Sequence, residues 1–445
     1  MNWRKIFRRT VSILFAVSIM LFAAVSHAEI YIGEGSYCMS EGENLGVAKE
    51  RAKADAMRYA CEQAGVYVKS YSRERNFELE EDVIETITAN IIKLVEEPHF
   101  LPYEQIDNME GLLIRVTVKA QIDDSDITRW LNKDEQEKST LVSQMEALRK
   151  ANEEQARQIA ELKRQLAAKP QDREQITKKF EAEDKIFLSN QKVADGWKLW
   201  EQKDFNGAKN LFDEAVKLNP DNAGAYYGRG TACNGLKQYE QAIKYFDKAI
   251  ELKLNPNLSY AYNNRGNAYS DLGQNERAIQ DYNKAIELNP NYAEAYNNRG
   301  VAYMDGLKQY ERAIQDYNKA IELNPNYADA YYNRGNAYKA LGQYERAIQD
   351  YNKTIELNPN FDKAYNNRGI AYNETRRNEL AIQDYNKAIE LNPNYANAYN
   401  NRGWAYYCMK KYEQALKDFE KALELNPNHT KAKNNREACL KAIGK

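Results

Sequence analysis

The sequence predicts a mainly α-helical protein in which a helical solenoid follows a small α+β domain and a coiled-coil helix. Three observations support this prediction. The stretch AIQDYNKAIELNPNYA begins at Ala278, Ala313 and Ala381, so the start-to-start distances are 35 and 68 residues, and 68 is twice 34. A fixed period near 34 is typical of stacked helix–turn–helix repeats. Apolar residues recur at heptad spacing before the repeats, and residues 29–130 alternate strand-like with helix-like segments.

Residues 1–28 have the features of a signal peptide. Basic residues within the first nine positions precede Val11 to Val25, a stretch that is apolar except for two serines. Ser26 and Ala28 are small residues at the third and first positions before a cut after Ala28. The alternative is an uncleaved anchor helix, but about fifteen apolar positions are short for a span of roughly 20 residues. We expect cleavage, and a periplasmic or secreted protein with no stable membrane span.

Residues 29–130 predict a small α+β domain in which helices cover one face of a sheet. Gly65 is expected to end the first helix, as a glycine after the last turn commonly does. The run after it favours β-structure. Strands are expected over Tyr31–Tyr37, Val66–Tyr71, Phe100–Gln105 and Leu112–Ala120, and helices over Leu45–Gln63 and Glu80–Leu94.

The order AKADAMRYACEQAGVYVKSYS, then a helix, then a strand through VTVKAQI resembles the N-terminal domain of the flagellar assembly protein T family and related envelope proteins. The resemblance implies an envelope-associated assembly module and transfers no catalytic residues. An oxidising compartment would permit a disulfide between Cys38 and Cys61, and two unpaired thiols are an equal alternative. No C-x-x-C pair supports a zinc or thioredoxin-like site.

Residues 133–168 predict a coiled coil. Apolar and amide residues follow one another at steps of four and three, which places them at the a and d positions of about four heptads. The amides within the seam can fix register and oligomer number. We expect a homo-oligomer formed through this helix, and the alternative is a single solvated helix. Lys169 and Pro170 end the seam, and residues 169–188 are expected to form a linker helix. The seam residues are Leu141, Met145, Leu148, Asn152, Gln155, Ile159, Leu162 and Leu166.

Residues 189–429 contain seven copies of the repeat. Each copy has a glycine in its first helix, an alanine twelve or thirteen residues later, an aromatic residue four positions after the alanine, and a closing proline. Small residues let two helices approach closely, and the aromatic rings fill the space between neighbouring hairpins. The glycines are Gly196, Gly230, Gly266, Gly300, Gly335, Gly369 and Gly403.

In this pattern the chain resembles the tetratricopeptide repeat (TPR) family. The resemblance implies a TPR helical solenoid with an open concave groove. One departure is an arginine before the glycine, where the family usually has leucine. We expect the arginine stem to pack and its head to stay solvated. One extra residue within Met304–Gln309 is expected to lengthen a hairpin turn. Residues 430–445 are expected to form a C-terminal capping helix. Trp404 and Cys408 are expected to help pack against it, and the alternative is a local apolar contact between the two.

The resemblance also implies that residues just before each glycine line the groove. There, an asparagine recurs two positions before the glycine, and an amide can pair with any peptide backbone. A second row lies one position earlier and is expected to be more exposed. The alternative is that these amides join neighbouring helices. The first row is Asn264, Asn298, Asn333, Asn367 and Asn401, and the second is Asn263, Asn297, Asn366 and Asn400.

The composition argues against several functions. The net charge of −2 does not favour nucleic-acid binding, which needs a basic surface. The three histidines are far apart, and no hydrolase, metalloprotease, P-loop or dinucleotide motif is present. We therefore expect that the protein is not an enzyme and that it binds no cofactor and no metal ion. The preferred function is an exported scaffold or adaptor that binds proteins or extended peptides in envelope or flagellar assembly. The alternatives are a structural spacer or a regulator of a cell-wall enzyme complex.

Overall fold

The computed structural model describes residues 28–40, 44–74, 88, 92–102, 104–105, 111–131, 142, 150–151, 153–165, 173–254 and 257–444. They form two compact units, residues 1–236 with 251–257, and residues 237–250 with 258–445. Apart from Ala28, the expected signal peptide lies outside the described residues. Within the described residues, every helix is too short or too polar to cross a bilayer.

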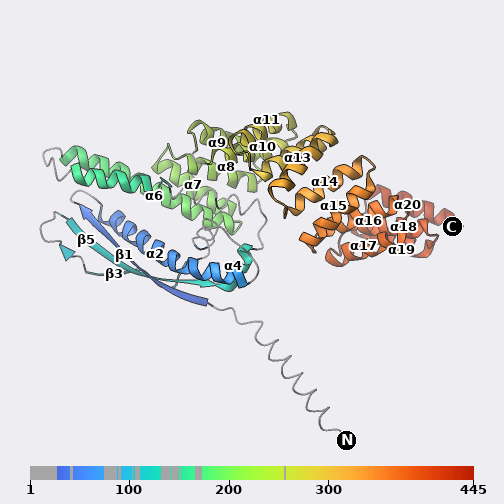
Figure 1. The fold of residues 1–445 in the computed structure, drawn as a ribbon, viewed down its shortest axis with the longest axis horizontal. Helices are drawn as coiled ribbons and strands as arrows, with labels where there is room; N and C mark the ends of the chain where they lie inside the picture. Colours follow the sequence, from blue (N-terminus) through green and yellow to red (C-terminus); the bar gives the residue numbers. More distant parts are fainter. Residues whose placement is uncertain are drawn as a thin grey trace, which may run out of the picture. The chain divides into compact units, whose positions relative to one another are not determined.

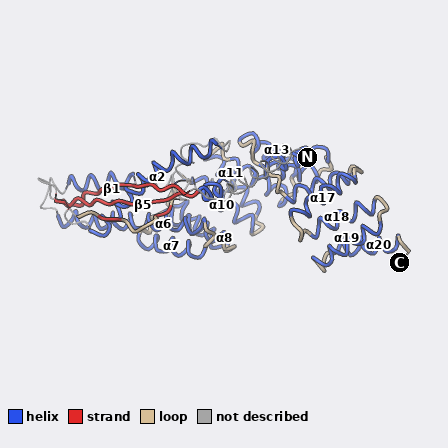
Figure 2. Tube along the Cα trace, turned by 90° about the horizontal axis from the view of Figure 1, so that it is seen from below, coloured by secondary structure: helices blue, strands red, loops and turns tan. Residues whose placement is uncertain are grey.

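The N-terminal domain is a sheet built around one long central strand. This strand lies beside the first strand (Figure 2) and pairs antiparallel with it along its whole length. It also pairs with three two-residue strands on its other side. A long helix lies along the two long strands, and a short helix follows the sheet (Figure 1). The elements are β1 (Ala28–Ser40), α2 (Leu45–Glu74), β2 (Lys93–Leu94), β3 (His99–Phe100), β4 (Glu104–Gln105), β5 (Gly111–Asp123) and α4 (Asp124–Leu131).

Helix α2 packs on the sheet through a stripe of small residues. Alanines recur every fourth position and are fully buried, against strand glycines that allow very close approach. A Cβ added to Gly33 would lie 2.0 Å from the carbonyl oxygen of Ala56, and backbone could not yield that space. The stripe is Ala48, Ala52, Ala56, Ala60, Ala64 and Val68.

This stripe explains why the strand predicted over Val66–Tyr71 is wrong. The four-residue spacing continues through Ala64 to Val68, which is fully buried, so the sheet favours continued helix. A glycine inside a helix costs about 1 kcal/mol relative to alanine, which burial of Val68 offsets. Gly65 therefore lies inside α2, and the helix ends at Glu74.

The other N-terminal predictions have mixed outcomes. The strands expected over Tyr31–Tyr37 and Leu112–Ala120 are confirmed within β1 and β5. The strand expected over Phe100–Gln105 is two short strands, β3 and β4. The helix expected over Glu80–Leu94 lies mostly outside the described residues, and its last two residues form β2 instead.

The disulfide left open between Cys38 and Cys61 is not formed in the structure, where neither cysteine is part of a disulfide. Helix α2 runs antiparallel to β1, so Tyr37 contacts Arg51 near the start of the helix. Cys61 lies ten residues further along, a rise of about 15 Å. Disulfides need Cα atoms within about 7 Å of each other.

The described part of the heptad seam packs within the chain. Residues 153–165 are helical, and Ile159 and Leu162 form an apolar cluster with Ile176 and Phe180 of helix α6. Gln155 is buried and donates from Nε2 to the carbonyl oxygen of Glu183 at 2.6 Å. The partner that we expected from a second copy is thus supplied here by α6. The rest of the seam lies outside the described residues, and self-association through it stays a prediction.

The remaining helices form the solenoid predicted from the repeats (Figure 1). In copy one and in copies three to seven, a ring of the second helix packs against the glycine of the first, so a Cβ on Gly300 would lie 2.6 Å from Tyr317. The helices are α6 (Arg173–Glu201), α7 (Phe205–Leu218), α8 (Ala223–Gly235), α9 (Tyr239–Glu251), α10 (Leu258–Asp271), α11 (Asn275–Leu288), α12 (Ala293–Val301), α13 (Tyr310–Leu323), α14 (Ala328–Ala340), α15 (Tyr344–Leu357), α16 (Asp362–Glu374), α17 (Asn378–Leu391), α18 (Ala396–Cys408), α19 (Tyr412–Leu425) and α20 (Thr430–Ala442).

Two details differ from the sequence expectations. The linker helix expected over 169–188 and the first helix of copy one are a single helix, α6, from Arg173 onward. The extra residue of copy four does not lengthen the turn. It is absorbed as a π-helical segment, η3 (Ala302–Gly306), that widens the last turn after α12. There the buried Met304 contacts the hydroxyl of Tyr317, so widening keeps the hairpin core closed.

Candidate functional site

The asparagine face is the set of first-helix side chains that lie two and three positions before the glycine in copies three to seven. Successive first helices α14, α16, α18 and α20 contact one another, so these side chains meet across the helix boundaries. The face consists of Asn263, Asn264, Asn297, Asn298, Tyr332, Asn333, Asn366, Asn367, Asn400 and Asn401, and it continues to Asn435 of α20.

The amides of this face form a hydrogen-bonded relay, which is the alternative that the sequence left open. Within one helix, the earlier asparagine donates to the later one, as Asn297 does to Asn298 at 3.3 Å. Across helices, each later asparagine donates to the earlier asparagine of the preceding copy. These contacts are Asn298 to Asn263 (3.2 Å), Asn333 to Asn297 (3.0 Å), Asn401 to Asn366 (3.0 Å) and Asn435 to Asn400 (3.0 Å).

The exposure of the two rows is the reverse of our expectation. Asn263, Asn297, Asn366 and Asn400 were expected to be more exposed, but all four are buried, with at most 5% of their surface accessible. They lie between neighbouring first helices, where they both donate and accept. In the other row Asn264 is also buried. Asn298, Asn333, Asn367 and Asn401 are only partly buried and are the members of that row that a ligand would reach.

The partly buried row is not uniform in its remaining hydrogen-bonding capacity. Asn298 uses a second N–H on Asn267 at 3.2 Å, and Asn367 donates both to Tyr332 at 3.0 Å and to Asn336 at 2.8 Å. Asn333 and Asn401 each make one donation among the described residues. Their second N–H groups are therefore the donors of this row that stay available to a ligand.

Because copy five has Tyr332 in the earlier position of the pair, the side-chain oxygen of Asn333 remains available as an acceptor. Tyr332 replaces the asparagine that, in the neighbouring copies, donates to the next residue. No such donation reaches the Oδ1 atom of Asn333 within the described residues, so the Asn333 amide offers both a donor and an acceptor. Copy five is thus where the relay is most open to an added hydrogen-bonding group.

The arginine before each glycine is not solvated, so that prediction is wrong. Arg299 makes a bidentate pair with Asp316 of the second helix, at 2.8 Å for Nε–Oδ2 and 2.6 Å for Nη2–Oδ1. Its Nη1 donates to Asn283 of the preceding second helix at 2.6 Å, and its guanidinium lies 5.5 Å from the ring centre of Tyr296. The same clamp recurs as Arg265–Asp281, Arg334–Asp350, Arg368–Asp384 and Arg402–Asp418.

A signal for these clamps was present in the sequence, because an aspartate follows each arginine by 16 or 17 positions. Burial lowers the pKa of the Arg334 guanidinium, but the hydrogen bonds and charge of Asp350 raise it more, so the pKa is raised overall. Each clamp is therefore a closed ion pair that leaves little charge for a ligand.

Lys339, in the last turn of α14, breaks this pattern of paired charges. Half-buried lysines of the second helices, such as Lys319 and Lys353, pair with a glutamate three residues on at 2.6 Å. Lys339 is also partly buried, yet its ammonium makes no ion pair or side-chain hydrogen bond with any described residue. Burial lowers the pKa of this ammonium, and no carboxylate opposes the shift.

An exposed aromatic pair lies two copies further on. The rings of Trp404 and Tyr407 stack at 5.3 Å with an interplanar angle of 14°, and Tyr407 meets Tyr412 edge-on at 5.4 Å. Trp404 is 38% accessible, unlike the buried rings of the hairpin cores. It follows its glycine directly, as do Asn267 and Asn336, which border the asparagine face. The indole therefore stacks on a ring of its own helix, and much of it is exposed.

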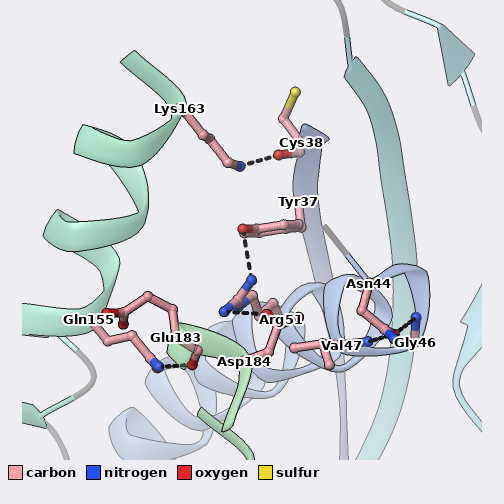
Figure 3. A network of polar contacts seen from close by, with 10 residues as sticks. All are labelled: Tyr37, Cys38, Asn44, Gly46, Val47, Arg51, Gln155, Lys163, Glu183 and Asp184. Atoms are coloured by element: carbon pink, nitrogen blue, oxygen red, sulfur yellow. Dashed lines mark hydrogen bonds and ion pairs between the residues drawn. The ribbon is translucent and has the colours of Figure 1, made fainter. Parts of the chain in front are cut away.

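A second polar cluster lies in the N-terminal unit and is already closed (Figure 3). Arg51 of α2 donates to the Tyr37 hydroxyl at 3.2 Å and pairs with Asp184 of α6 at 3.0 Å. Lys163 donates to the carbonyl oxygen of Cys38. These contacts join the sheet domain to the helical hairpin, and the charges satisfy one another. Within the described residues, no group of three or more potential ligands is placed to hold a metal ion.

The fold and its polar face define the class of protein: an α-helical repeat solenoid that presents side chains along stacked first helices. Family comparison assigns the repeats more closely, and over these residues the chain belongs to the tetratricopeptide repeat family. The matches described as tetratricopeptide repeat are 194–257, 245–280, 328–361, 362–395 and 396–429, and those described as TPR repeat are 266–305 and 307–342.

Solved structures of TPR proteins are similar to this chain. YrrB, described as a TPR protein with an unusual peptide-binding site, is 29% identical, with a TM-score of 0.37 over 43% of this chain and 97% of YrrB. MamA is 31% identical, with a TM-score of 0.35 over 37% and 96%. A TPR protein from Parabacteroides merdae is 24% identical, with a TM-score of 0.45 over 57% and 99%. A search of curated proteins found no match.

Proposed function

We propose that the repeats bind an extended segment of a partner protein along the asparagine face. TPR proteins mediate protein–protein interactions and are typically non-catalytic scaffolds, which agrees with a face that carries amides rather than converging titratable groups. The observation that carries the proposal is the spare capacity of Asn333 and Asn401. An extended backbone presents N–H and C=O groups at regular intervals, and amides can pair with both.

A peptide display library tests this proposal directly. Random 12-residue peptides are selected on the full chain, and affinities of the enriched peptides are measured by fluorescence anisotropy. The double variant Asn333→Ala and Asn401→Ala should weaken binding about tenfold or more, since each lost hydrogen bond contributes roughly 1 kcal/mol. The matched control is Asn326→Ala with Asn394→Ala, two exposed turn asparagines. Equal losses in both double variants, or no enriched peptide, would contradict binding along this face.

The cellular setting is a separate part of the proposal. We infer an exported adaptor whose N-terminal domain docks to an envelope or flagellar assembly, supported by the basic and apolar start and by the resemblance of residues 29–130. A cut after Ala28 would remove one residue of β1 and leave its remaining ladder with β5 intact. N-terminal sequencing of the protein from fractionated cells tests export: a mature start at Glu29 in the periplasm or medium is expected, and an intact Met1 in the cytoplasm would refute it.

The runner-up function is a structural spacer, in which the repeats only separate other parts of an assembly. The relay and the arginine clamps favour it, because both rigidify the array without needing a ligand. It predicts that the Asn333 and Asn401 variant assembles normally in cells, whereas the adaptor function predicts loss of a partner. Regulation of a cell-wall enzyme is a third possibility, and the same variant tests it through the activity of such an enzyme.

A further inference from the structure

The half-buried Lys339 carries a charge that is unusual at its position in the repeats. The corresponding positions in the other copies of the second unit hold uncharged residues, namely Ser270, Met304, Asn373 and Tyr407. Placing an ammonium among packed helices without an anion costs stability. Such a cost is typical of groups that acquire their partner from a ligand.

The other open groups lie on α14, which carries Lys339, and on α18. Asn333 belongs to α14, as Lys339 does, and Asn401 belongs to α18, as Trp404 does. Together, α14 and α18 therefore offer one partly buried cation, two amides with spare capacity and one exposed indole. Elsewhere on the described face, the arginines are clamped and Asn298 and Asn367 have used both N–H groups.

The spacing of these groups fits an extended chain. Neighbouring packed helices lie about 8–10 Å apart, and α16 stands between α14 and α18 with contacts to both. Lys339 and Trp404 are thus separated by roughly 16–20 Å across the face. An extended peptide rises about 3.3 Å per residue, so this separation corresponds to about five or six residues.

We propose that α14 and α18 together bind an extended peptide segment that carries an acidic side chain at Lys339 and an aromatic or large apolar side chain five or six residues away at Trp404. The peptide backbone pairs with Asn333 and Asn401 between the two anchors. This inference rests on the proposed peptide-binding function and specifies the sequence that the face selects. The acidic group completes the charge pairing that Lys339 lacks, and the apolar group covers the free face of the indole.

The library selection described above tests the sequence preference. The wild-type chain should enrich peptides in which Asp or Glu stands five or six positions from an aromatic or large apolar residue. Selection on Lys339→Met, which keeps most of the apolar stem, should lose the acidic preference and retain the apolar one. Selection on Trp404→Ala should do the reverse. Lys417→Met, a change at an exposed lysine of α19, is the control and should leave both preferences unchanged.

Affinity measurements on one enriched peptide then test the pairing itself. Lys339→Met should lower affinity about 10- to 100-fold, as expected for a lost hydrogen bond to a charged group. Replacing the acid of the peptide with its amide should cost the same on the wild type and nothing more on Lys339→Met. Independent, additive losses would overturn the proposed contact. If peptides bind through Asn333 and Asn401 without any effect of Lys339 or Trp404, this inference fails and the proposed function stands; if no peptide binds, both fail.

Discussion

Removing only one residue of an arginine–aspartate clamp should cost far more stability than replacing both residues with apolar ones. In copy five, Asp350 is 5% accessible and accepts two hydrogen bonds from Arg334, at 2.9 Å from Nε and 2.6 Å from Nη2. Removing one partner from a buried pair costs about 3–5 kcal/mol. The Arg334 side chain is 19% accessible, so water recovers part of that cost, and we expect about 3 kcal/mol for Asp350→Ala.

The double variant Arg334→Leu with Asp350→Leu should behave differently. Apolar residues of similar volume can replace a buried ion pair at little cost, and leucine is the residue that the family usually has at the arginine position. We expect the double variant to lie within about 1 kcal/mol of the wild type. The clamp would then show a coupling energy of several kcal/mol, because the two single losses do not add.

The pH dependence of Arg334→Leu gives a further check. Burial raises the pKa of the Asp350 carboxyl, and Arg334 opposes that shift. Without Arg334 the pKa should rise further, so the folded state takes up the proton before the unfolded state as pH falls. The stability loss should therefore be full at pH 7 and shrink towards lower pH.

Hydrogen exchange followed by mass spectrometry is the suitable assay, since repeat arrays do not unfold as one two-state unit. Peptides from α14 and α15 report the local free energy of opening, and peptides from α19 and α20 serve as an internal reference. The reasoning is refuted if Asp350→Ala changes the local free energy by less than about 1 kcal/mol, or if the double variant is no more stable than the single ones.

Three further predictions concern other parts of the chain. Gly33→Ala should unfold the N-terminal domain, seen as loss of protection in β1 and β5, because its Cβ would meet the Ala56 carbonyl; a native exchange pattern would contradict this close approach. Ile159→Asp should detach residues 153–165 from α6. If the seam pairs only within the chain, the mass measured by sedimentation should not change. A drop in mass would instead support self-association. Lys339→Met should raise the local free energy of opening of α14, measured by hydrogen exchange, by about 1 kcal/mol at pH 7. Because burial lowers the pKa of Lys339 in the folded state, this gain should fade as pH rises from the folded-state pKa towards the unfolded value. A pH-independent difference would exclude the burial argument.

Sequence patterns predicted the parts of the fold that each copy repeats. Seven copies carry the same glycine and aromatic ring, so helix order and hairpin packing followed from spacing alone. The end of α2 could not be predicted in this way, because local β-propensity at Val66 competes with burial of Val68 against a sheet that is distant in sequence. The widened turn at η3 was also hidden, since an insertion in a sequence does not show which dihedral angles absorb it.

For the candidate face, the sequence predicted a set of positions but not which amides already have hydrogen-bond partners. An asparagine can join helices or bind a ligand, and the difference lies in which N–H groups are already used. Asn298 and Asn333 occupy equivalent positions, yet Asn267 takes the second donor of Asn298 and no described residue takes that of Asn333. Such differences depend on neighbours about 31 to 36 residues away and need coordinates to resolve.

The relay of amides has a consequence for how such a chain can change length. Every cross-helix donation points from a later copy to an earlier one, from Asn435 back to Asn263. Each contact between neighbouring copies thus has the donor on the later copy and the acceptor on the earlier one. Tyr332 can replace an asparagine there because its hydroxyl oxygen accepts a hydrogen bond. Gene duplication or deletion of a whole unit would leave matching ends at the new junction, so evolution can lengthen or shorten this array without redesigning its seams.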